Sequence, residues 1–217
     1  MCIRDRAGLT LAKLPQHSVI ATSSTRRAAA VRAARPDLEV VPIRGNVGTR
    51  LQKLRDNLEL DATLLAAAGL IRLNFDISPQ GCLRVDPRLS AQLRAQIAPP
   101  PTGVLATLLE PEVFLPAVGQ GALGLQTRSD DLETQSLASA LNHSNTFAAI
   151  TAERSLLTAM GGGCQSPVAA YARVLGHQVH LSAEWYQDGS RKGVEGRRPV
   201  REAAELGREL AARLLAA

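Results

Sequence analysis

The pattern of apolar and polar residues in the first part of the chain alternates between strands and helices. An apolar run at residues 18–24 precedes a helical pattern at 25–35, and a strand pattern follows at 38–44. The same order then recurs, with a helix at 46–56 and a buried strand at 61–69. Strands that alternate with helices predict a parallel α/β sheet, in which ligands bind where strands lead into helices.

The middle of the chain has little periodicity. We expect residues 74–112 to be irregular, with one or two short helices. Beyond it the pattern predicts a strand at 121–128, a helix at 130–142 capped by Ser129 or Asp130, and a longer amphipathic helix at 145–160.

The C-terminal part has a different pattern. Three strands are expected at 166–174, 177–186 and 191–200, with a turn at 187–190, before a terminal helix at 201–215. This order predicts a small antiparallel sheet with helices, in a second domain that begins near Asn142.

Composition narrows the classes of function. The 217 residues carry a net charge of +5 and only six aromatic side chains, so acidic small molecules are favoured over nucleic acid as partners. The first ten residues lack the pattern of a secretory signal, and three cysteines at unrelated spacings fit a reducing compartment. We therefore expect a cytoplasmic protein that binds neither membrane nor metal.

Two stretches place arginines where a strand leads into a helix. In "TSSTRR", Ser24 ends the strand and Arg26 and Arg27 lie in the first helical turn, where free N–H groups and the helix dipole attract anions. In "RGNVGTR", Arg44 and Arg50 repeat the arrangement one unit later. Neighbouring strand ends of this kind make a cleft for a polyanion. Ordinary helix caps and turns with solvated arginines remain the alternative.

A third stretch, "GGGCQSP", follows the helix at 145–160 and precedes a strand. A glycine helix stop followed by a buried thiol is the commoner arrangement. However, three glycines leave space around Cys164 for a large group bonded to its sulfur, and a thiolate is a strong covalent nucleophile.

The glycines of "LPAVGQGALG" precede a strand, so they do not make a dinucleotide fingerprint. His177 and His180 face opposite sides of a strand, and His17 and His143 lie in predicted turns, which favours surface or capping roles.

Together these stretches resemble the porphobilinogen deaminase (hydroxymethylbilane synthase) family. The strings "TSSTRR", "RGNVGTRL", "AAAGLIRL", "LPAVGQGALG", "ALNH", "AERSLL" and "GGGCQSP" match in type and order from about Lys13 to the C-terminus. The family resemblance implies a periplasmic-binding-protein-like doubly wound domain, with a remnant of a first domain, and a small α+β domain with a three-stranded antiparallel sheet. The ranges would be 13–116 for domain 2, 117–141 for a crossing segment and remnant of domain 1, and 142–217 for the C-terminal domain.

The resemblance also implies a site and a reaction. A dipyrromethane cofactor would be joined to Cys164 by a thioether, and its carboxylates would be bound by Ser24, Arg26, Arg27, Arg44 and Arg50, with Arg72 as a further substrate-binding residue. Porphobilinogen would be polymerised, with loss of ammonia, into the linear tetrapyrrole hydroxymethylbilane. Arginines would neutralise and position the growing chain, and the enzyme would be a monomer.

The chain departs from the family pattern in three places. The family's catalytic aspartate lies upstream of "TSSTRR", so we expect most of domain 1 to be missing, residues 1–12 to be a non-native or disordered start, and the chain to be inactive alone. The segment at residues 74–112 is longer than the usual family spacing, and Cys82 within it is expected to be incidental. In "QSP" a serine stands where a small apolar residue is frequent.

The alternative is a non-catalytic carboxylate-binding α/β module on the same fold, which would have no use for a covalent anchor.

Overall fold

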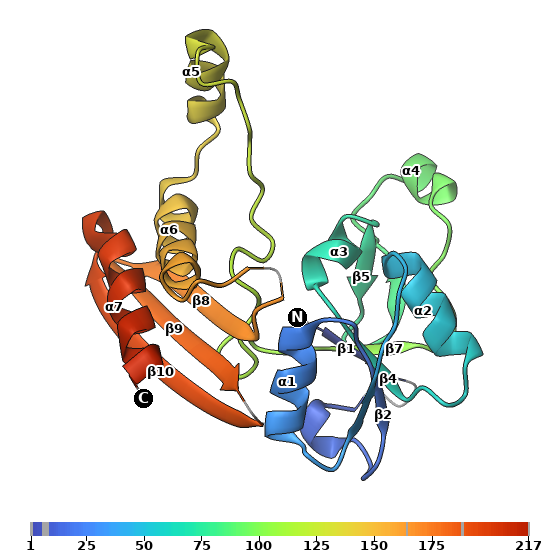
Figure 1. The fold of residues 1–217 in the computed structure, drawn as a ribbon. Helices are drawn as coiled ribbons and strands as arrows, with labels where there is room; N and C mark the ends of the chain where they lie inside the picture. The colour runs from blue at the N-terminus through green and yellow to red at the C-terminus, as the bar shows by residue number, and fades with distance from the viewer. Residues whose placement is uncertain (1, 6–8, 164, 188, 217) are drawn as a thin grey trace. The chain divides into compact units, whose positions relative to one another are not determined.

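The computed structural model describes residues 2–5, 9–163, 165–187 and 189–216. Two compact units make up the chain (Figure 1). The first comprises Met1–Phe114 with Tyr186–Arg191, and the second comprises Leu115–Trp185 with Lys192–Ala217. Among the described residues, no helix is long and apolar enough to cross a membrane.

The first unit is built on a five-stranded sheet in the order β3-β2-β4-β1-β7. Strands β2, β3 and β4 are parallel, whereas β1 pairs antiparallel with both β4 and β7. The strands are β1 (Cys2–Asp5), β2 (Val19–Ala21), β3 (Glu39–Val41), β4 (Ala62–Leu65) and β7 (Leu105–Leu108). The predicted strand–helix alternation and the parallel pairing of β2, β3 and β4 are confirmed, and β1, which was not predicted, adds an antiparallel strand to this sheet.

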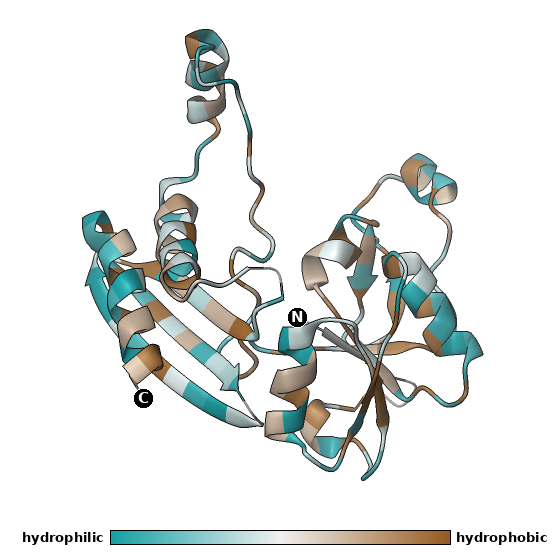
Figure 2. Cartoon of the chain, viewed as in Figure 1, coloured by the Kyte–Doolittle hydropathy of each residue, from teal (hydrophilic) through white to brown (hydrophobic). Residues whose placement is uncertain are grey.

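Four helical segments accompany these strands: η1 (Leu11–Lys13), α1 (Thr25–Ala34), α2 (Val47–Asp56) and α3 (Ala67–Ile71). The predicted buried strand at 61–69 ends at Leu65 and gives way to α3, since the run of alanines favours a helix once the chain leaves the sheet. Residues 2–5 form a paired strand, in a stretch where we expected a non-native or disordered start. The largest fully buried side chains of the unit are Ile20, Leu51, Leu54, Leu64 and Leu70, and the middle strands β2 and β4 are accordingly hydrophobic (Figure 2).

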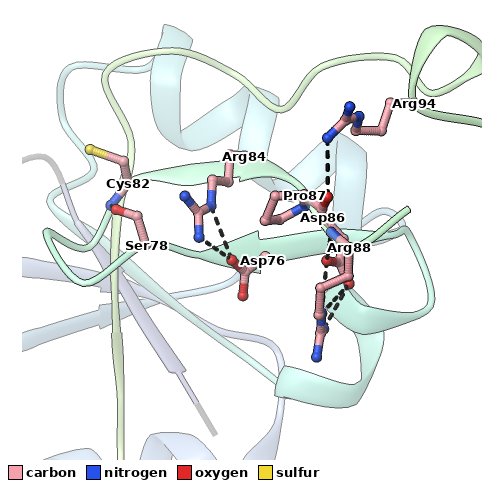
Figure 3. Close-up of polar contacts among 8 residues, drawn as sticks. All are labelled: Asp76, Ser78, Cys82, Arg84, Asp86, Pro87, Arg88 and Arg94. Atoms are coloured by element: carbon pink, nitrogen blue, oxygen red, sulfur yellow. Dashed lines mark hydrogen bonds and ion pairs between the residues drawn. The ribbon is translucent and has the colours of Figure 1, made fainter. Parts of the chain in front are cut away.

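The middle of the chain is more regular than its sequence indicates. It forms a hairpin of β5 (Phe75–Ile77) and β6 (Leu83–Val85), then the short α4 (Ala91–Gln96), before β7 joins the main sheet. Polar pairs hold this segment (Figure 3), with Arg84 Nη2 2.8 Å from Asp76 and Arg88 Nη2 2.7 Å from Asp86. Hydrogen bonds from Arg88 lower the pKa of Asp86 to about 2. Asp76 and Arg84 are partners across the two strands. Charged residues at strand positions interrupt the apolar alternation, which is why periodicity missed the hairpin.

Cys82 lies at the end of the turn in this hairpin, and its side chain is exposed. Its backbone N–H donates to Ser78 Oγ at 3.1 Å, and its carbonyl accepts from the Ser78 N–H at 2.9 Å. The residue therefore closes a turn through its backbone, and its thiol contributes nothing to that contact.

The second unit consists of a three-stranded antiparallel sheet and helices, as predicted. The sheet order is β10-β9-β8, and α6 and α7 pack together over it (Figure 1). Its elements are α5 (Leu132–Ala140), α6 (Ser144–Ala159), β8 (Val168–Leu175), β9 (Gln178–Gln187), β10 (Ser190–Pro199), η2 (Val200–Glu202) and α7 (Ala203–Ala216). Apolar side chains of α6, α7 and the sheet form one core, including Leu156, Leu181, Leu206, Leu210 and Leu214.

Two details before α6 differ from expectation. The strand predicted at 121–128 is wrong: the described chain places no strand there, and Leu123 is 97% exposed. An alternating pattern forms a strand only beside a neighbour that accepts its hydrogen bonds.

The helix after residues 121–128 is α5, but its N-cap is Asp131, whose side chain accepts from the Thr134 N–H at 3.0 Å. The expected capping role of His143 is confirmed at the start of α6.

Candidate functional site

The carboxyl ends of β2 and β3 are held side by side. The Thr22 N–H donates to the Val41 carbonyl at 2.8 Å. The Ser23 hydroxyl donates to the Ile43 carbonyl at 2.8 Å and accepts from the Ile43 N–H at 3.0 Å. Ser23 thus continues the pairing of the two strands after both have ended, and it fixes the two predicted arginine loops next to each other.

The first loop leads into α1, which Ser24 caps. Its hydroxyl accepts from the Arg27 N–H at 3.4 Å, and its own N–H donates to Thr22 Oγ1 at 3.2 Å. Both predicted arginines are in the first turn: Arg26 is only 4% exposed, and Arg27 is half-buried. Two guanidinium groups and the amino end of the helix thus place positive charge together at this position.

Arg27 also reaches across the sheet. Its Nη1 donates to the Leu64 carbonyl, near the end of β4, at 2.9 Å. From β2 the chain passes to β3 on one side of β2 and then to β4 on its other side. The direction in which strands are added therefore reverses between β2 and β4. Ligands of parallel α/β sheets bind at such a position, beyond the carboxyl ends of the strands.

The second loop leads into α2, which Asn46 caps. Asn46 Oδ1 accepts from the Thr49 N–H at 2.8 Å and from its hydroxyl at 3.0 Å. Gly45 has φ +122°, and a Cβ there would lie 2.8 Å from Thr49 Cβ, so the turn requires glycine. Arg50 Nε donates to the Gly45 carbonyl at 2.8 Å, which directs its stem back over the loop.

The exposed Arg44 belongs to a groove of about 880 Å³ along the β3 edge. Lys53, which the sequence analysis missed, also lines this groove, and its Nζ donates to the Arg44 carbonyl at 3.0 Å. Lys53 stands three residues after Arg50 on α2, and this helical spacing is the signal that could have found it. Glu39 and Glu59 line the same groove, so its charge is mixed.

The structure therefore places the predicted residues in two groups. Ser24, Arg26 and Arg27 gather at the start of α1, and Arg44 and Arg50 flank the start of α2, with Ser23 joining the two loops. Arg72 is exposed at the C-terminal end of α3, and its role remains a prediction.

The glycine loop of the second unit has its own internal order, although Cys164 lies outside the described residues. Gly161 ends α6 with φ +64°. The Gly163 N–H donates to Ser166 Oγ at 2.8 Å, and the Ser166 N–H donates to the Gly163 carbonyl at 3.0 Å. A Cβ on Gly162 would lie 2.6 Å from Leu157 Cδ1 and 2.8 Å from Ser166 Oγ. Glycine is thus needed at 162 for a close approach, and Ser166 closes the turn.

Gly162→Ala tests this packing, with Gly163→Ala as its matched control. A Cβ at 162 must displace Leu157 and Ser166, so we expect the unfolding free energy of the second unit to fall by about 1–2 kcal/mol. A Cβ at 163 would meet nothing within 4 Å, and no comparable loss is expected there. Thermal unfolding, with hydrogen exchange of the Gly163 amide, measures both effects. Equal stability of the two variants would contradict the role of Gly162.

Comparison with known proteins gives the same family for both units. Residues 1–136 match the model of the porphobilinogen deaminase, dipyrromethane cofactor binding domain, and residues 147–216 match that of the porphobilinogen deaminase C-terminal domain. A porphobilinogen deaminase of Trichlorobacter lovleyi is 42% identical over 217 residues, covering 96% of this chain and 59% of the relative. One of Roseiflexus sp. is 44% identical over 174 residues (80% and 48%), and one of Geobacter sulfurreducens is 41% identical over 213 residues (96% and 58%).

The chain is therefore a member of an α/β family with a separate C-terminal domain. It belongs to the porphobilinogen deaminase family. It spans about half to three fifths of the length of the curated relatives that it matches.

Proposed function

We propose that the chain carries the cofactor-binding and C-terminal parts of an enzyme that polymerises porphobilinogen, with loss of ammonia, into hydroxymethylbilane. The observation that carries the proposal is the pair of arginine-bearing helix starts joined by Ser23. Membership of the family supports it, because the model that matches the first unit is named for binding the dipyrromethane cofactor.

We propose that Cys164 forms the thioether to the cofactor, and that five residues bind its carboxylates. These are Ser24, Arg26, Arg27, Arg44 and Arg50, with Arg72 binding substrate. When bound, the dipyrromethane would supply the free α-carbon to which the first porphobilinogen is added, and each later one would be added to the end of the growing chain. The donor set fits such a group, since guanidinium and helix N–H donors at the start of α1 match carboxylates and no acidic side chain lies between Thr22 and Arg35.

The protein's own contribution would be electrostatic and orientational. Arg26 is buried, so its charge is little screened by water and acts more strongly on a carboxylate than a surface arginine does. Arg27 is held by Leu64, and Arg50 by Gly45, so neither guanidinium needs to lose much freedom when an anion arrives. Such groups would bind the anion, orient it and neutralise its charge.

We further propose the domain order of the family fold for this chain. Residues 13–116 would be a doubly wound domain of the periplasmic-binding-protein type, which the change of direction in the order β3-β2-β4 supports. Residues 117–141 would be a crossing segment that belongs partly to another domain, and residues 142–217 the C-terminal domain. The leucines of the crossing segment support this division, because Leu123, Leu125, Leu132, Leu137 and Leu141 are all exposed.

We place the protein in the cytoplasm, because its three unpatterned cysteines fit a reducing compartment. We propose a monomer that acts on a small molecule, as the family resemblance implies.

Intact-protein mass spectrometry tests the proposal on the chain fused to the upstream part of a full-length curated relative and incubated with porphobilinogen. We expect a mass increment of dipyrromethane size that peptide mapping locates at Cys164 and that Cys164→Ser abolishes, whereas the exposed Cys82→Ser retains it. Reversible binding of porphobilinogen without any covalent increment would instead identify a carboxylate-binding module and overturn the enzyme proposal.

A further inference from the structure

The second unit contains one buried carboxylate that the proposed site does not use. Glu153 lies on α6 within the string "AERSLL" and is only 4% exposed. Its Oε2 accepts from the Gly119 N–H at 2.7 Å, and its Oε1 accepts from the Ala172 N–H at 2.8 Å. Each oxygen thus binds one backbone amide, and the two amides belong to different segments of the chain.

These two amides lie where the sheet meets the crossing segment. β8 is an edge strand, and successive outward N–H groups of such a strand need acceptors other than a neighbouring strand. The Ala170 N–H donates to the Pro116 carbonyl at 3.1 Å, and two residues later the Ala172 N–H donates to Glu153. Pro116, just before the crossing segment, therefore pairs with β8 like a residue of an added strand, and Glu153 replaces the next backbone acceptor.

Gly119 explains why a side chain is needed at this position. With φ +69°, Gly119 turns away from an extended conformation, so it cannot continue a strand ladder along β8. Its N–H still has to be satisfied in a partly buried place, and the carboxylate accepts it together with the Ala172 N–H. Loss of the carboxylate would leave two donors of two segments without their acceptor.

The charge environment of Glu153 is simple. Burial raises the pKa of Glu153, and the Gly119 and Ala172 amides act in the opposite direction. Residues 115–127 carry no charged side chain, and the nearest charges along α6 and β8 are Arg154 and Arg173. Because burial raises the pKa in the folded state, the cost of burying the charge is absent below the unfolded pKa of Glu153 and grows as pH rises through the folded pKa, and the two N–H donors to the ionised carboxylate reduce that cost.

We propose that Glu153 is a positioning residue that clamps the crossing segment at Gly119 to the edge strand β8. The clamp ties three elements, α6, β8 and the segment that begins at Pro116, at one carboxylate. Since β8 follows directly on the glycine loop closed by Ser166, the clamp also fixes where that loop leaves the helix–sheet core. In this last consequence the inference rests on the proposed function.

Hydrogen exchange of single amides tests the clamp without any cofactor. In Glu153→Gln, which keeps the shape but offers one acceptor oxygen, we expect protection of the Gly119 and Ala172 amides to fall at least tenfold. Protection of the Val179 amide on β9 should change much less. The matched control is Glu205→Gln, a glutamate on the exposed face of α7, which should leave both amides protected. Unchanged protection in Glu153→Gln would overturn the proposal.

The wild-type chain gives a second measurement that needs no variant. The amide resonances of Gly119 and Ala172 should shift together during a pH titration, with one common midpoint above 4.5, the ordinary value of a glutamate pKa. Separate midpoints, or no shift at either amide, would overturn the clamp.

Cofactor uptake, measured in the same fusion to the upstream part of a relative, gives a separate test of the consequence for the loop. We expect the mass increment at Cys164 to form at least tenfold more slowly in Glu153→Gln than in Glu205→Gln, and equal rates would overturn the positioning role. A wild-type chain that gains no increment refutes the proposed function, while the exchange and titration results still decide the clamp.

Discussion

Replacing Gly207 with alanine is expected to lower the unfolding free energy of the second unit by about 3 kcal/mol, because the new methyl group has no room. A Cβ at this position would overlap the Ala152 carbonyl oxygen and lie 2.7 Å from the Leu156 nitrogen. These are backbone atoms of α6, so they cannot swing aside as a flexible side chain does. The cost far exceeds the roughly 1 kcal/mol that alanine gains over glycine in a helix.

Trp185 makes the effect measurable. It is the only tryptophan of the chain, and it lies on β9 in the second unit, so its fluorescence reports the unfolding of that unit. We expect the midpoint of thermal unfolding to fall by about 10 °C or more. Arg208→Ala, at the next and exposed position of α7, should stay within about 0.5 kcal/mol of the wild type. A Gly207→Ala protein as stable as Arg208→Ala would show that α6 and α7 do not approach as closely as described.

The regular parts of the fold were predictable because local pattern and tertiary packing agree there. The strands and helices between Val19 and Leu65 could be predicted from the sequence, because the apolar residues that indicate each element are also residues that the fold buries. The β8–β10 sheet follows for the same reason. Periodicity alone could not show that β1 runs antiparallel, since strand direction depends on pairing partners and not on the pattern within a strand.

The wrong strand predictions lie where the structure depends on a neighbouring strand more than on the residue pattern. Residues 121–128 alternate like a strand, but a strand needs a neighbour, and Leu123 and Leu125 are exposed in the described chain. The hairpin of β5 and β6 has the opposite character, because its partners are present while its pattern is weak and Asp76 and Arg84 stabilise it through charge.

The candidate site shows the same division between local and tertiary signals. The sequence places Ser24, Arg26 and Arg27 at a helix start because a capping residue before a helical pattern is a local signal. It cannot show that Ser23 binds Ile43 or that Glu153 accepts from Ala172, since these contacts join residues 20 and 19 positions apart in sequence. Backbone-directed hydrogen bonds of this kind fix how the loops sit, and no residue pattern encodes them.

The second large effect is expected from the arginines of α1. Arg26→Ala and Arg27→Ala should each weaken the binding of porphobilinogen at least tenfold, because a hydrogen bond between charged groups contributes about 1.5–3 kcal/mol. Isothermal titration calorimetry measures the affinity, and circular dichroism checks that each variant is folded. Arg27→Ala also removes the contact with the Leu64 carbonyl. Part of its loss of affinity should therefore persist at high salt, which screens only the charge interaction.

Arg32→Ala is the matched control for both variants. Arg32 lies in the last turn of the same helix and is exposed, so its removal changes the net charge equally without touching the amino end of α1. We expect its affinity for porphobilinogen to stay within a factor of two of the wild type. An equal loss in all three variants would show that the general positive charge of the unit attracts the ligand, and that the start of α1 is not its binding site.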